Sequence, residues 1–228
     1  MRKVFGAMVA LAGLAAIQLT ASVDGDRKRL TEAATVLQEI HQVPDKDIPD
    51  DLWAKAECIA VIPSVKKAAF IVGGEYGKGP VSCRIGNGWS APAFLELQKG
   101  SIGFQIGAES VDLVLLVMNR KGVDRLLDSK VALGTEASVA GGPVGRDVRA
   151  MTDVQMKAEI LSYSRAQGLF AGIDLTGGVL KADTDENKEF YGRAMNATDI
   201  LKGGTLQAPP GSSVFLNALK RTMPAHER

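Results

Sequence analysis

The sequence predicts a single α+β domain: a curved, mostly antiparallel β-sheet, barrel- or sandwich-like, with short peripheral helices. Residues 160–180 alternate apolar with polar or small side chains, and glycines at 168, 172, 177 and 178 interrupt the alternation. This pattern indicates extended backbone that bends at defined places. Asn87-Gly88 is the strongest hairpin signal in the chain. The connections between the apolar runs of residues 58–118 are short, which favours antiparallel pairing.

The composition fits one domain with a sizeable core. Of 228 residues, 46% are hydrophobic, which is enough for a single core, whereas only 5% are aromatic and 25 are glycine. Tight turns and bends are therefore more prominent than bulky aromatic packing. The formal net charge of +1 argues against a protein that coats nucleic acid through bulk charge, so any basic surface must be local.

Residues 1–22 have the layout of a secretory signal peptide. Basic residues at positions 2 and 3 precede an uncharged apolar run at 4–19, and small residues follow as far as Ser22. The run is short for a membrane span, which favours cleavage near Ser22 over retention as an uncleaved anchor. We therefore expect residues 23–228 to form the mature domain, in the periplasm or secreted.

The first helix of the mature chain should begin at Asp24 or Asp26 and end near Gln42, because its apolar residues recur on one face. A short helix at 49–57 should follow, with Trp53 turned inward.

Three basic residues, Arg27, Lys28 and Arg29, lie at the start of the first helix. Basic side chains at this end oppose the helix macrodipole. Either something anionic lies nearby, or the three side chains form a solvated charged face.

The remaining elements follow from apolar runs separated by turn signals. Strands are expected at 58–62, 68–72, 81–85, 93–97, 102–106, 111–118 and 156–180. Residues 63–67 and the glycine-rich segment 73–79 should be connections. Short helices are expected at 123–127, 185–193, 198–201 and 212–221.

Cys58 and Cys83 are the two cysteines, and they fall on strands expected to be neighbours. In an oxidising compartment such a pair is a disulfide candidate, with two buried free thiols as the alternative. Two cysteines and two widely separated histidines do not suit a four-ligand zinc site, so no metal site is expected.

Several short segments resemble catalytic or nucleotide-binding motifs, but each lacks residues that the complete motif requires. Lys78 in the glycine-rich segment is followed by Gly79, so the hydroxyl of a Walker motif is missing. Ser64 and Lys67 match the pattern of serine acyl-enzymes, but its partner motifs are lacking. The acidic run at 183–187 is not a calcium loop, and its aspartates suit a helix cap instead. We therefore expect no enzymatic activity.

Local anion recognition remains as the chemistry that the residues favour. Basic residues lie in or beside the glycine-rich blocks and are Lys66, Lys67, Lys78, Arg84, Arg146, Arg149 and Arg165. If the sheet brings several together, they suit a phosphorylated lipid headgroup, because arginine is bidentate to phosphate. The alternative for each is an exposed salt bridge, which contributes little.

Residues 163–177 read Tyr-Ser-Arg-x-x-Gly-Leu-Phe-Ala-Gly-x-x-Leu-x-Gly, which closely resembles the signature of the SYLF-domain family. Further blocks resemble the same family in the same order, at 73–79, Arg84, 89–92, 103–107, 142–146 and 187–192. Together they span about residues 30–205. So many ordered blocks make the resemblance specific.

The resemblance implies a lipid-binding module, found alone in bacterial envelope proteins and joined to SH3 or FYVE domains in eukaryotes. It implies an exported, non-enzymatic protein without a cofactor, which binds anionic phospholipid or phosphoinositide-type headgroups peripherally at a membrane. Phosphatidylglycerol and cardiolipin are natural candidates for an exported chain. Eukaryotic members are also linked to actin, which we do not expect as a partner of an exported protein.

Membrane contact is expected from the helix that carries Arg27, Lys28 and Arg29, or from an apolar loop at Leu169-Phe170. For Leu169 and Phe170 burial in the core is favoured, because apolar residues within a strand motif are usually buried. The alternative function is an envelope structural or interaction protein that binds a protein partner through a sheet edge.

Overall fold

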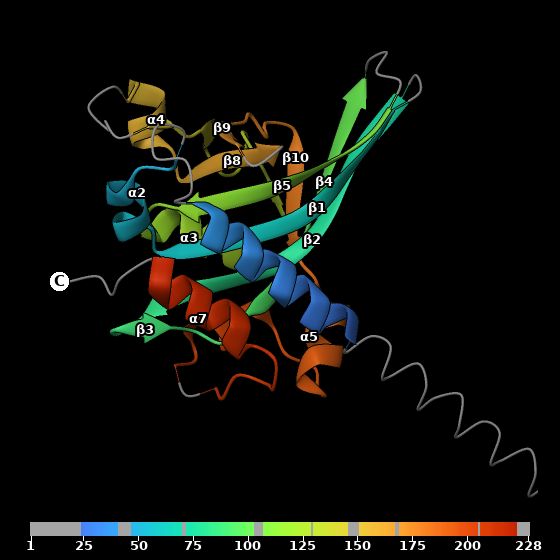
Figure 1. Ribbon diagram of the computed structural model, residues 1–228, viewed down its shortest axis with the longest axis vertical. Helices are drawn as coiled ribbons and strands as arrows, with labels where there is room; N and C mark the ends of the chain where they lie inside the picture. The colour runs from blue at the N-terminus through green and yellow to red at the C-terminus, as the bar shows by residue number, and fades with distance from the viewer. Residues whose placement is uncertain are drawn as a thin grey trace, which may run out of the picture.

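A single curled β-sheet organises the chain in the structure, which is a computed structural model (Figure 1). It describes residues 24–40, 47–69, 72–102, 107–128, 130–145, 151–166, 169–204 and 206–222, with backbone alone at 67–69, 72–73, 101–102 and 107–109. The named strands pair antiparallel except where β7 meets β8. The predicted α+β class, with a curved and mostly antiparallel sheet, is confirmed.

The main path of the sheet runs in the order β6-β10-β4-β2-β1-β5-β8-β7, and β3 and β9 pair with β2 and β8. The strands are β1 (Cys58–Ala69), β2 (Val72–Ile85), β3 (Gly88–Trp89), β4 (Ala93–Ile102), β5 (Gly107–Val117), β6 (Lys130–Ala132), β7 (Val139–Gly141), β8 (Ile160–Ala166), β9 (Leu169–Gly172) and β10 (Gly178–Ala182). The four longest strands, β1, β2, β4 and β5, are adjacent and form the centre of the sheet.

Helices pack against both faces of the sheet. They are the N-terminal helix (residues 24–39), α2 (Asp50–Lys55), α3 (Arg120–Leu127), α4 (Asp153–Lys157), α5 (Thr184–Tyr191), α6 (Ala197–Lys202) and α7 (Ser213–Thr222). The N-terminal helix and α7 lie side by side across one face (Figure 1), where Thr222 donates a hydrogen bond to the carbonyl of Leu37. No helix in the described ranges has the length and apolar character to cross a bilayer.

The two faces of the sheet bury two apolar clusters. One cluster joins the apolar face of the N-terminal helix, Trp53 of α2 and Phe215 of α7 to the sheet. The other fills the concave side and includes Leu201 of α6 and Leu126 of α3. The predicted inward positions of the N-terminal helix face and of Trp53, which is 1% exposed, are confirmed.

Strand β1 is continuous from Cys58 to Ala69, so the predicted break at 63–67 is wrong. A β-bulge interrupts its pairing with β5 between Ile62 and Val65. At Ser64 the backbone has a φ of 54°, and its N–H donates to a carboxylate oxygen of Asp112 at 2.9 Å. The extra residue is absorbed within the strand, as β-bulges do, and no turn forms.

The glycine-rich segment 73–79 is also strand, as part of β2, and its prediction as a connection is wrong. A Cβ on Gly77 would lie 2.7 Å from side-chain carbons of Ile62 and Val65, and one on Gly79 would lie 1.9 Å from the carbonyl oxygen of Val61. Glycine is therefore required there because β1 approaches too closely for any side chain.

A disulfide joins Cys58 of β1 to Cys83 of β2, which confirms the bonded alternative for the two cysteines. The two residues are directly paired in the antiparallel register. The predicted hairpin is confirmed too, with Gly86 and Asn87 in the turn and β3 beginning at Gly88.

The predicted strand at 156–180 begins only at Ile160, because residues 153–157 form α4. A capping box starts this helix: Thr152 accepts from the N–H of Gln155, whose side chain accepts from the N–H of Thr152. The other predicted short helices correspond to α3, α5, α6 and α7.

Candidate functional site

Four strands extend beyond the helices at one end of the sheet, at the upper right of Figure 1. We call this extension the arm, which comprises residues 65–69, 72–76, 98–102 and 107–111 of β1, β2, β4 and β5. One row of paired residues crosses it in the order Gln98, Tyr76, Lys66 and Ser110. Residues paired across strands project from the same face of a sheet, so these side chains lie in one row.

Lys66 and Tyr76 form the exposed centre of that row. Tyr76 is 44% exposed, and Lys66 is exposed and takes part in no ion pair with the residues that the structure describes. Further along the same face, Gly74 and Gly100 are paired and carry no side chain. A Cβ placed on Gly100 would have nothing within 4 Å. The arm therefore presents a lysine, without an ion pair among the described residues, beside an exposed tyrosine.

Lys78 lies two residues beyond Tyr76 in β2, and its partners are carboxylates. Its ammonium group contacts Asp183 and lies 3.3 Å from Glu186, at the start of α5. Burial alone would lower the pKa of Lys78, but its hydrogen bond to Asp183 and the charge of that carboxylate raise the pKa overall. Because Asp183 and Glu186 are buried, Lys78 compensates charge inside the protein.

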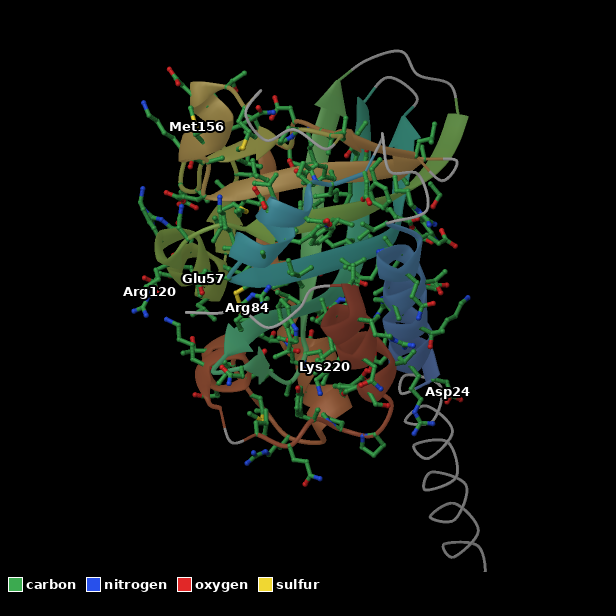
Figure 2. The ribbon with its side chains drawn as sticks, turned by 60° about the vertical axis from the view of Figure 1, so that its left-hand side comes forward. Asp24, Glu57, Arg84, Arg120, Met156 and Lys220 are labelled. Carbon is green, nitrogen blue, oxygen red and sulfur yellow. A yellow bond between two sulfur atoms is a disulfide. The ribbon has the colours of Figure 1, made fainter. Side chains whose placement is uncertain are left out.

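Arg84 binds backbone carbonyls at the end of α2. Its Nε donates to Ala56 at 2.9 Å and its Nη2 donates to Trp53 at 3.2 Å, while the guanidinium lies 4.6 Å from the ring centroid of Trp89. Burial lowers the pKa of Arg84, and the nearby charge of Glu57 acts in the opposite direction. Figure 2 shows Arg84 and Glu57 together at this end of the sheet, far from the arm. The role of Arg84 here is structural.

Arg165, from the signature segment, connects three elements. It donates to Asp112 of β5 at 2.9 Å and contacts Glu39 of the N-terminal helix. Burial lowers the pKa of Arg165 and raises that of Asp112, so both ions lose hydration in this pair. The contact between Arg165 and Glu39 fixes the end of the N-terminal helix to the sheet.

The single basic pocket expected from the sequence does not form from these three cations. Lys78, Arg84 and Arg165 each have protein partners, and six residues of β2 place Lys78 and Arg84 about 20 Å apart. Lys67 is paired through its backbone with Glu75 and Glu109, and its side chain is outside the described atoms. Arg146 and Arg149 lie outside the described residues.

The basic start of the N-terminal helix has partly internal partners. Lys28 lies 3.8 Å from Glu32, and Arg27 lies 3.9 Å from Asp24; both pairs are exposed. Arg29 lies 3.5 Å from the buried Asp26.

Arg29 also reaches α5, where it contacts the carboxylate of Glu186. Asp26, Arg29, Glu186 and Lys78 thus form one partly buried charge network. Burial raises the pKa of Asp26 to about 6, although the charge of Arg29 opposes this shift. The anionic group predicted near the start of this helix is therefore, in part, Glu186 of α5.

The signature segment packs closely against the chain at the end of β7. Tyr163 is fully buried, and a Cβ on Gly142 would lie 2.0 Å from its ring. A Cβ on Gly172 would lie 2.3 Å from the carbonyl oxygen of Gly142. Phe170 is 4% exposed, which confirms the favoured core position, whereas Leu169 is 41% exposed and its favoured burial is wrong. Of this predicted loop contact, only Leu169 reaches the surface.

Sequence reasoning missed Tyr76, because the segment around it was assigned to a connection. A signal was present: residues 72–79 contain no Asn, Asp or Pro, so only glycine marks a turn there. It also missed a cleft between the end of α5 and the start of α7. No group of three His, Cys, Asp or Glu in the described chain is placed to hold a metal ion.

The fold defines a class of protein, an α+β domain built on one curled and mostly antiparallel sheet. Residues 98–222 match the profile of the Ysc84 family, described as "Las17-binding protein actin regulator". The chain belongs to this family, which is the SYLF family that its sequence resembles. The recognition made from the signature is confirmed.

Curated relatives support this assignment over most of the chain. SH3 domain-containing YSC84-like protein 1 of Rattus norvegicus is 35% identical over 191 residues, which is 81% of this chain and 56% of the relative. LAS seventeen-binding protein 3 of Saccharomyces cerevisiae is 30% identical over 180 residues, 77% of this chain and 39% of the relative. The chain thus spans about half the length, or less, of these curated relatives.

Proposed function

We propose that this chain is a non-enzymatic binding domain that associates with anionic phospholipid membranes through its arm. The observation that carries the proposal is the pair formed by Lys66 and Tyr76, an ammonium group without an ion pair among the described residues beside an exposed tyrosine. A basic residue near an anionic membrane contributes about 1 kcal/mol. Tyrosine favours the membrane–water interface because its ring is apolar and its hydroxyl is polar.

The sequences that connect the strands of the arm contain apolar residues. Strands β1 and β2 are joined through Phe70 and Ile71, and the segment between β4 and β5 contains Phe104 and Ile106. These four residues lie outside the described residues. Apolar residue types of this kind favour contact with a bilayer.

Export is part of the proposal. It is supported by the signal-peptide layout of residues 1–22 and by the disulfide between Cys58 and Cys83, since such bonds persist in oxidising compartments. In that location phosphatidylglycerol or cardiolipin supply the anionic surface.

Vesicle co-sedimentation tests the proposal. The mature chain should bind vesicles that contain phosphatidylglycerol, should bind phosphatidylcholine vesicles poorly, and should release as salt rises. The double variant Lys66→Ala, Tyr76→Ala should bind at least about tenfold more weakly, since it loses both contacts. Lys130→Ala, an exposed lysine of β6, is the matched control and should bind normally. Undiminished binding by the double variant would contradict the arm as the contact.

A second candidate function is recognition of a protein partner. Helix α4 buries none of its residues, and Val154 and Met156 are 68% and 62% exposed, with Met156 projecting from the molecule in Figure 2. The yeast relative is named for binding a protein, Las17. A photoreactive residue at position 156 should crosslink one partner in cell-envelope extracts if this function holds. Crosslinks no more frequent than those from position 130 would exclude α4 as the contact.

A further inference from the structure

A cleft of about 970 Å³ opens between the end of α5 and the start of α7. One wall is residues 189–193, and the other is residues 206–213 with Leu216. Its volume lies in the range of about 300–1,000 Å³ that holds small ligands. The cleft is separate from the arm and from the signature segment.

Most of the second wall is apolar. Its apolar residues are Leu206, Ala208, Pro209, Pro210 and Leu216. The two prolines restrict the backbone, so this wall is held in shape without helix or strand. At Gly211 the φ of 97° lets the chain turn directly into α7.

The end of the cleft at α7 is polar. Ser212 immediately precedes the helix, lines the cleft and is 1% exposed. Its hydroxyl has no hydrogen-bond partner among the residues that the structure describes. The first N–H groups of the ten-residue helix α7 have no partner within the helix, and they carry its positive dipole end. Such a helix start, together with an unpaired hydroxyl, suits an anionic oxygen.

One arginine lines the cleft, and a second lies beside it at Gly211. Arg193 lines the cleft, is exposed, and forms no ion pair in the described part of the chain. Arg27 packs over Gly211, where a Cβ would lie 3.0 Å from its Cγ and 3.5 Å from its Nε. In the lining, Glu189 is the carboxylate and Arg193 is the cation, while Arg27, beside the lining at Gly211, also lies 3.9 Å from Asp24.

We propose that the cleft binds one anionic phospholipid molecule. Its phosphate lies at the start of α7, where it accepts hydrogen bonds from Ser212 and from the first N–H groups of the helix and faces Arg193. Its glycerol and upper acyl chains lie along Leu206, Pro209 and Leu216. This inference rests on the proposed membrane function and adds a headgroup site, whereas the arm supplies surface contact.

Isothermal titration calorimetry with dihexanoyl-phosphatidylglycerol, kept below its micelle concentration, tests the site. The wild type should bind it saturably with one molecule per chain. The double variant Arg193→Ala, Ser212→Ala should bind at least tenfold more weakly while it unfolds at the same temperature. Arg221→Ala removes a guanidinium near the opposite end of α7 and should bind as the wild type does. Equal affinity in the double variant and the wild type would overturn the proposal.

Two further ligands identify what the cleft recognises. Dihexanoyl-phosphatidylcholine should bind more weakly than the phosphatidylglycerol, because its headgroup carries a compensating cation. Inorganic phosphate should bind much more weakly, because it cannot use the apolar wall. If phosphate alone bound as tightly as the lipid, the cleft would be an anion site only and the lipid assignment would be wrong.

The vesicle experiment separates this inference from the proposed function. Saturable binding of the short lipid without any vesicle binding would leave the cleft assignment standing and overturn membrane association. Vesicle binding that depends on Lys66 and Tyr76, without saturable binding of the short lipid, would overturn the cleft assignment alone.

Discussion

The two ends of the central strands use the same residue types in opposite ways. At the helix-covered end, Lys78 lies between buried carboxylates, and Gly79 gives the backbone of β1 its space. In the arm, Lys66 has no ion pair among the described residues, and a Cβ on Gly100 would meet open space. A lysine or glycine in these strands therefore takes its role from what lies beside it. The covered end therefore has structural roles, and the arm is the membrane contact in our proposal.

The largest difference between the two ends should appear when a methyl group is added to a glycine. Gly79→Ala places a Cβ against the backbone of Val61 and Ile62, so we expect it to cost more than about 4 kcal/mol or to prevent folding. Gly100→Ala should stabilise the arm by up to about 1 kcal/mol, because alanine loses less backbone freedom on folding. Urea unfolding of both variants measures this. Similar free energies of unfolding for the two variants would contradict the difference between the covered end and the arm.

Removing the disulfide should be the next largest effect, and it acts at the covered end. The bond joins residues 25 positions apart, and closing a loop of that length stabilises by about 3.5 kcal/mol in the chain-entropy account. Replacing Cys58 and Cys83 with alanine should lower the free energy of unfolding by about that amount. Adding reductant to the wild type should reproduce the loss, and no change with reductant would argue against a formed bond.

The two kinds of cation should differ in their effect on stability. Arg165→Met leaves Asp112 half-buried without its partner and frees Glu39, so we expect a loss of about 3 kcal/mol. Lys66→Met should change stability by less than about 0.5 kcal/mol, because this side chain is exposed. Thermal unfolding of the two variants gives the comparison. A large loss in Lys66→Met would mean that this lysine is structural after all.

The pH dependence of stability should report the charge network at the covered end. The pKa of Asp26 is raised from 3.8 to about 6, so the folded protein holds this proton more tightly than the unfolded chain. The contribution of protonated Asp26 to the free energy of unfolding is therefore full below about pH 4 and is lost as the pH rises through about 6. Asp26→Asn imitates the protonated acid and should be more stable than the wild type at pH 7.5, by up to about 3 kcal/mol.

The difference between Asp26→Asn and the wild type should shrink towards pH 4, where the wild-type acid is itself protonated. Urea unfolding of both proteins at pH 4.5 and 7.5 measures this. A variant less stable than the wild type at pH 7.5 would show that the ionised carboxylate stabilises the fold.

Local patterns in the sequence predicted much of the fold. The apolar face of the N-terminal helix, the inward Trp53 and the hairpin at Asn87-Gly88 each depend on neighbours a few residues away. The pairing of Cys58 with Cys83 was within reach because the two strands are adjacent. These features require no knowledge of distant contacts.

The structural roles of the buried cations could not be predicted from local patterns, because their partners are distant in the chain. Lys78 meets Asp183, and Arg165 meets Asp112 and Glu39, so no local pattern distinguishes them from Lys66. The prediction that the glycine-rich part of β2 is a connection was wrong for a similar reason. A glycine that marks a turn and a glycine that admits a neighbouring strand look alike until β1 is in place.

Depth-dependent quenching tests most directly whether the arm is the membrane contact. Tyr76→Trp places a fluorophore at its centre, while the native Trp53 is buried and Trp89 gives a constant background. On phosphatidylglycerol vesicles with brominated acyl chains, bromine should quench the added tryptophan at 76, and quench far less a tryptophan introduced by Lys130→Trp on β6. Equal quenching at both positions, or none at position 76 while the protein is bound, would contradict the account.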